Sequence, residues 1–85
     1  MASFEYTITE PMGLHARPAG LLVKQLKNYT SSVEISCRER KADAKKLFAL
    51  MNLGIKYGDR VTVTVSGEDE RKAVQEIQDF FTQNI

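Results

Sequence analysis

The only histidine of the chain, His15, lies in the stretch GLHARPAG, after a glycine and a leucine and just before Ala16, Arg17 and Pro18. From Ala16 onward, apolar residues recur at helical spacing, which predicts a helix that begins directly after the imidazole. Pro18 suits the first turn of that helix, because its missing N–H costs little there. His15 is therefore predicted to lie at a helix N-terminus.

This position suits the binding of a phosphoryl group. The first N–H groups of a helix, here those of Ala16 and Arg17, have no partners within the helix, and the helix dipole adds positive potential. The Arg17 guanidinium adds a permanent charge and a planar set of donors that matches phosphate oxygens. A neutral imidazole placed there can attack phosphorus and carry the group. The alternative is a loop histidine that only caps the helix.

Hydropathy patterns predict the elements that must position this site. Alternating apolar and polar residues indicate strands, and a 3.6-residue repeat indicates amphipathic helices. Strands are predicted in FEYTI, in SVEISC, in a short segment that follows the polar turn RERKAD, and in RVTVTVSG. Helices are predicted from Ala16, in KKLFALMNLG and in EDERKAVQEIQDFFTQNI. The order βαββαβα is typical of one sheet with helices on one face, an α+β open-faced β-sandwich.

Two connections carry turn signals of different strength. Gly54 follows the short second helix at a position typical of a left-handed helix end. The turn RERKAD lacks the Asn-Gly pair that marks a tight two-residue hairpin.

Composition limits the classes of function. The chain of 85 residues predicts one domain, 1–85, and its 12 Lys and Arg against 11 Asp and Glu do not favour nucleic-acid binding. Cys37 is the only cysteine, so neither an internal disulfide nor a structural zinc site is expected. No segment has the apolar length of a signal peptide or a membrane helix, and a cytoplasmic protein without membrane insertion is expected.

Three stretches resemble the histidine-containing phosphocarrier (HPr) family of the bacterial phosphoenolpyruvate-dependent sugar phosphotransferase system. GLHARPA at 13–19 resembles its active-site signature, and AKKLFALMNLGIKYGD at 44–59 resembles its second helix and the following loop. VTVTVSGEDERKAV at 61–74 is similar to its last strand and the start of its last helix. The resemblance covers essentially the whole chain and implies a four-stranded antiparallel sheet covered by three helices.

The resemblance also implies a function. A protein of this family accepts a phosphoryl group from the phosphorylated first enzyme of the system and passes it to sugar-specific EIIA-type domains. His15 matches the phosphorylated histidine, which carries the phosphate on Nδ1 as a pros-phosphohistidine, and Arg17 matches the arginine that stabilises it. Such a protein is an intermediate of phosphoryl transfer rather than a stand-alone enzyme, and neither a cofactor nor a metal is expected.

Further residues match the surfaces with which the family meets its partners. Leu47, Phe48 and Met51 match an apolar docking surface near the active site, and Lys24 and Lys27 fall where the family meets acidic partner surfaces. The alternatives are that the three apolar residues belong to the core and that the two lysines form the solvated side of an ordinary helix.

One position departs from the family pattern. Where many members carry a regulatory serine at the start of the second helix, this chain has Lys46, which has no hydroxyl to phosphorylate. The serine cap is lost as well, and Asp43 is expected to cap a helix that begins slightly earlier.

The alternative to a general carrier is a regulatory binding module or specialised paralogue of the same fold, which docks to a regulator or an enzyme. A small nucleic-acid binder is disfavoured because aromatics do not interleave on adjacent strands. A self-contained hydrolase is disfavoured because no second catalytic base lies at an interpretable spacing.

Overall fold

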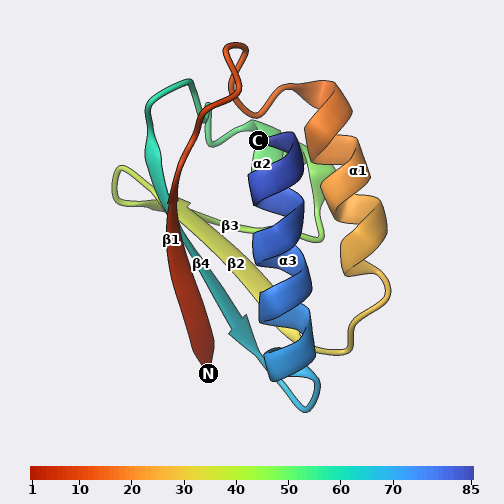
Figure 1. Cartoon of the computed structure of the whole chain (residues 1–85). Helices are drawn as coiled ribbons and strands as arrows, with labels where there is room; N and C mark the ends of the chain where they lie inside the picture. The colour runs from red at the N-terminus through yellow and green to blue at the C-terminus, as the bar shows by residue number, and fades with distance from the viewer.

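The computed structural model describes all residues from Met1 to Ile85. Its strands are β1 (Ala2–Thr7), β2 (Ser32–Cys37), β3 (Arg40–Asp43) and β4 (Arg60–Ser66), and its helices are α1 (Ala16–Leu26), α2 (Leu47–Met51) and α3 (Glu70–Asn84). The strands pair antiparallel in the order β1-β4-β2-β3, and the helices cover one face of the sheet (Figure 1). The predicted open-faced sandwich with the order βαββαβα is confirmed. None of the three helices is both long enough and apolar enough to cross a membrane.

The core lies between the sheet and the helices. The strands bury alternate side chains, as the sequence predicts: Val33, Ile35, Cys37, Val61, Val63 and Val65. Phe4 and Tyr6 of β1 point to the same side and meet the ring of Phe81 edge-on, with centroid distances of 5.6 and 5.5 Å. Edge-on aromatic pairs add about 0.5–1.5 kcal/mol beyond the area that they bury. Helix α3 is therefore held to the edge strand β1 by aromatic contacts.

The connection between β2 and β3 is tighter than the sequence predicts. Cys37 pairs with Arg40, which leaves only Arg38 and Glu39 in the turn. Both adopt left-handed backbone conformations, with φ of +50° and +67°. This conformation costs an L residue roughly 1–2 kcal/mol, and two-residue turns that require it usually contain Asn-Gly. The segment RKAD, predicted as part of the turn, forms β3 itself.

Helix α2 begins at Leu47, with Lys46 as its N-cap residue, so the predicted earlier start with an Asp43 cap is wrong. Asp43 is the last residue of β3, and its carboxylate accepts the N–H of Lys45 at 2.9 Å instead of a helical N–H. Gly54 has a φ of +63°, in agreement with the predicted left-handed position, and its N–H donates to Met51 O at 3.1 Å.

Asp69 connects the start of α3 to the loop between α1 and β2. One carboxylate oxygen accepts the N–H of Thr30 at 2.9 Å, and the other accepts both the N–H of Ser31, at 3.0 Å, and its hydroxyl. Ser31 is the one polar residue that is fully buried, and its hydroxyl therefore depends on this carboxylate. The Ser31 hydroxyl and the Thr30 N–H lower the pKa of Asp69 to about 2.

Acid is expected to weaken this connection. Because the pKa of Asp69 is lower in the folded chain than the ordinary 3.8, its contribution to stability is complete above the ordinary value and is lost as the pH falls toward about 2. Asp69→Asn should lower the urea midpoint at neutral pH, and the difference from the unmodified chain should disappear in acid. Glu68→Gln, at a neighbouring exposed acid, is the control. Equal midpoints for the two variants at every pH would contradict the assignment.

Candidate functional site

His15 is the N-cap residue of α1, and the helix begins at Ala16 as predicted. The His15 carbonyl accepts the N–H of Ala19 at 3.1 Å, but the imidazole makes no capping hydrogen bond. The side chain is 32% exposed. The imidazole therefore does not cap the helix, and solvent or a partner can reach it.

The same helix end offers unpaired donors. The backbone N–H groups of Ala16 and Arg17 have no acceptor within the chain, and Pro18 has no N–H, so Ala19 donates the first helical hydrogen bond. No acidic residue lies in the first turn of α1. Free N–H groups and the positive end of the dipole together attract an anion. The exposed guanidinium of Arg17 adds a full charge at the same helix end.

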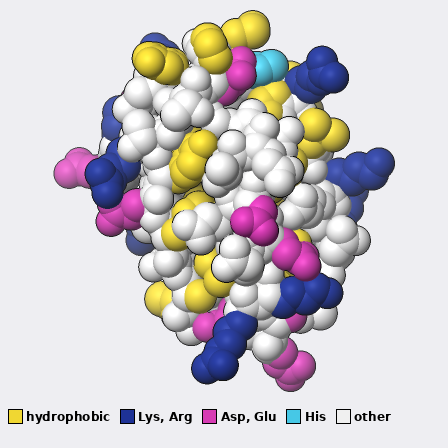
Figure 2. Space-filling model, viewed as in Figure 1, with side chains coloured by type: hydrophobic (Ala, Val, Ile, Leu, Met, Phe, Trp, Pro, Cys, Tyr) yellow, Lys and Arg dark blue, Asp and Glu magenta, His cyan; other side chains and the backbone are white.

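A surface hollow of about 340 Å³ opens beside His15. It is lined by Glu10, Met12, His15, Arg17, Pro18, Leu21 and Asn84. In Figure 2 the single histidine side chain, coloured cyan, lies at the surface near acidic and hydrophobic side chains. No three His, Cys, Asp or Glu side chains come close enough together to hold a metal ion. The hollow thus combines an accessible imidazole with a cation and an apolar rim.

Glu10 is a site residue that sequence reasoning missed. Its Oε1 lies 3.8 Å from Nε2 of His15, while its backbone N–H donates to Ile85 O at 2.6 Å. The carboxylate thus faces Nε2 and leaves Nδ1 without a partner in the chain. No periodic pattern could have found Glu10, because it lies in an irregular loop that is held by the far end of the chain.

The loop before His15 lies against the segment that follows α2. The N–H of Leu14 donates to Ile55 O at 3.1 Å. Gly13 has a φ of +67°, and a Cβ added there would lie 2.5 Å from Ile55 O and 2.8 Å from the Cα of Lys56. Only glycine allows both this conformation and this approach. The place of His15 is therefore set by a backbone segment some forty positions further along the chain.

The apolar residues of α2 divide between the core and the surface. Phe48 is 81% exposed, so the core alternative is wrong for this residue. Leu47 and Met51 are half-buried and pack against the core. Two further exposed apolar side chains, Met12 and Leu21, line the hollow beside His15.

The charged candidates lie at the surface. Lys24 and Lys27 are exposed on α1 and its C-cap, and Lys46 is exposed at the start of α2 without a side-chain cap. Leu21, an apolar residue of the hollow that sequence reasoning missed, could have been found, because it falls outside the apolar stripe of α1.

An accessible imidazole beside free helix N–H groups and an arginine is the arrangement expected of a phosphohistidine carrier. Comparison with known proteins agrees. A family model described as the PTS HPr component phosphorylation site matches residues 2–83. The chain therefore belongs to the HPr family and is a phosphocarrier of the phosphotransferase system that serves sugar transport.

The similarity extends over most of the length of the relatives. The chain is 43% identical to the phosphocarrier protein HPr of Buchnera aphidicola subsp. Baizongia pistaciae over 75 residues, which cover 88% of each chain. It is 34% identical to that of Lysinibacillus sphaericus over 83 residues, 98% of this chain and 94% of the relative. The solved structure of the Mycoplasma histidine-containing phosphocarrier protein matches with a TM-score of 0.93 and 33% identity, covering 96% of this chain and 93% of that one.

The exposure of Phe48 makes a prediction about stability. Phe48→Ala should change the free energy of unfolding by no more than about 0.5 kcal/mol, because the ring is 81% exposed. Phe81→Ala is the matched comparison and should lower it by about 3–5 kcal/mol, because that ring is 1% exposed. Urea unfolding of both variants measures the difference. A loss at Phe48 close to that at Phe81 would place Phe48 in the core.

Proposed function

We propose that His15 carries the phosphoryl group on Nδ1, accepts it from the phosphorylated first enzyme of the phosphotransferase system, and passes it to sugar-specific EIIA-type domains. The observation that carries this proposal is the pair of free N–H groups, on Ala16 and Arg17, at the helix end where the imidazole is accessible. His15 is the only histidine of the chain, so no second imidazole competes for this role.

The transfer needs the neutral imidazole with its proton on Nε2 and a lone pair on Nδ1. The Glu10 carboxylate lies 3.8 Å from Nε2 and therefore leaves Nδ1 free to react. As the Nδ1–phosphorus bond forms, the bond from phosphorus to the donor breaks, and the electron pair of that bond stays with the donor. The charged phosphoryl oxygens then bind the free N–H groups and the Arg17 guanidinium.

Docking is assigned to the surface formed by Leu47, Phe48 and Met51, together with the cations Lys24 and Lys27. Exposed apolar side chains at the centre of an interface and charges at its rim are typical of protein recognition. The exposure of Phe48 supports this assignment, because burying its ring against a partner removes apolar surface from water.

His15→Ala should abolish phosphorylation. Incubation of the unmodified chain with phosphoenolpyruvate and the first enzyme should add one phosphoryl group that acid removes, because phosphohistidine is acid-labile. Intact-protein mass measurement before and after acid treatment reads out both properties. A phosphorylated alanine variant would show that another residue carries the group.

Arg17→Ala should slow transfer roughly tenfold to a hundredfold, since losing a charge-assisted hydrogen bond costs about 1.5–3 kcal/mol. Arg71→Ala removes the same side chain from an exposed position of α3 and serves as the matched control. Single-turnover transfer to each variant gives the rates. Equal rates for the two variants would remove Arg17 from the mechanism.

Phe48→Ala should weaken docking more than it slows chemistry. Truncation of a central apolar residue costs about 1–2 kcal/mol or more, so the KM for the carrier should rise roughly fivefold to thirtyfold while kcat changes little. Thr64→Ala, on the face of the sheet away from the helices, is the control. An unchanged KM at Phe48 would place the docking surface elsewhere.

A further inference from the structure

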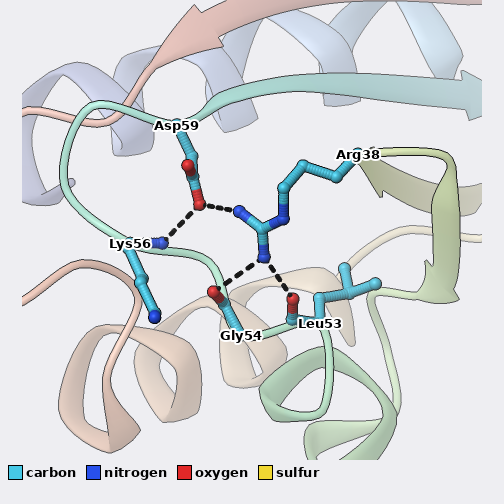
Figure 3. A network of polar contacts seen from close by, with 5 residues as sticks. All are labelled: Arg38, Leu53, Gly54, Lys56 and Asp59. Atoms are coloured by element: carbon cyan, nitrogen blue, oxygen red, sulfur yellow. Dashed lines mark hydrogen bonds and ion pairs between the residues drawn. The ribbon is translucent and has the colours of Figure 1, made fainter.

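The side chain of Arg38 joins three segments of the chain (Figure 3). Its guanidinium donates to the Asp59 carboxylate and to the carbonyl oxygens of Leu53 and Gly54, both at 3.0 Å. The same carboxylate accepts the N–H of Lys56 at 2.8 Å. One side chain from the β2–β3 turn thus holds both ends of the loop at 53–59.

Two contacts keep Asp59 in its charged form. The backbone N–H of Lys56 and the Arg38 guanidinium lower the pKa of this carboxylate. The ion pair therefore persists through the neutral range and into mild acid, and the loop remains held under the conditions in which a cytoplasmic carrier would be assayed.

The loop at 53–59 supports the backbone in front of His15. Its residue Ile55 accepts the Leu14 N–H at 3.1 Å, and the Cα of Gly13 lies so close that a Cβ would clash. The same loop also binds the end of β1, because the Ile8 N–H donates to Asp59 O at 2.9 Å. A displacement of this loop would therefore move the backbone on which His15 stands.

Arg38 and Glu39 both have left-handed backbone conformations, and of the two only the Arg38 side chain makes contacts that offset the strain. With a φ of +50°, Arg38 occupies a conformation in which glycine or asparagine is far less strained. The turn alone would be more stable with either residue. The Arg38 guanidinium makes three contacts that neither glycine nor asparagine can reproduce.

We propose that Arg38 is a positioning residue for phosphoryl transfer: by holding the loop at 53–59, it fixes Gly13 and Leu14 and so places His15 relative to the N–H groups of α1. The inference rests on the proposed role of His15. A misplacement of about 1 Å can cost a reaction up to a hundredfold, so a loosened loop should slow transfer measurably.

Arg38→Asn tests this role, because asparagine tolerates the left-handed turn but cannot reach the loop. Arg60→Asn is the matched control: it makes the same substitution and removes the exposed ion pair of Arg60 with Glu5 on neighbouring strands. We expect the saturating transfer rate of Arg38→Asn to fall about fivefold or more below that of Arg60→Asn. The amide hydrogen of Leu14 should also exchange with solvent faster in Arg38→Asn than in Arg60→Asn.

Arg38→Gly separates positioning from stability. Glycine relieves the strained φ, so this variant should unfold at a urea midpoint equal to or above that of Arg38→Asn, yet transfer just as slowly. A purely structural role would instead make the rate follow the midpoint.

Transfer rates for both Arg38 variants within about twofold of the Arg60→Asn rate would overturn the proposal, and so would an unchanged Leu14 exchange rate. If the unmodified chain takes no phosphoryl group, the proposed function fails. The Leu14 exchange rate then still decides whether Arg38 holds the loop.

Discussion

The contact of Gly13 with the backbone of Ile55 and Lys56 is the constraint on which the rest of the site depends. The two loops approach so closely there that no side chain fits on the Gly13 side. His15 follows this contact directly and begins α1, and the free N–H groups of that helix have a fixed direction relative to the loop. The geometry of the proposed phosphorylation site is thus a property of backbone packing, while its chemistry comes from the imidazole and Arg17.

Polar side chains at both ends of the molecule add directional contacts to loops that also place apolar residues in the core. Asp69 binds the α1–β2 loop at one end, and Arg38 binds the loop at 53–59 nearer to the site. The core includes Tyr29 of the first loop and Leu53 and Ile55 of the second. Other residues of these loops, such as Thr30 and Lys56, are exposed. Directional hydrogen bonds are needed there, and both sites use one charged group to satisfy several partners.

The docking role proposed for Phe48 accounts for an exposed apolar ring. Phe48 adds nothing to the core, and its exposure to water is tolerated because a single aromatic side chain is a small apolar patch.

Lys46 lies at the start of the same helix, α2, where it supplies neither a cap nor a hydroxyl. Helix α2 is consequently held by its neighbours, through Leu50 in the core and the Arg38 contacts just beyond its end.

The sequence alone determined the strands and the start of the first helix, which depend on neighbouring residues. The alternation in FEYTI, SVEISC and RVTVTVSG determined the strands, and the apolar stripe together with Pro18 determined that a helix begins after His15, because hydropathy periods and a proline act within a few residues. The tertiary structure alone decided the contacts between distant segments. The contacts of Arg38 with the loop at 53–59, of Leu14 with Ile55 and of Asp69 with the α1–β2 loop follow from how distant parts of the chain pack together. Such contacts join residues whose local patterns carry no sign of one another, since their partners are chosen by packing rather than by spacing along the chain.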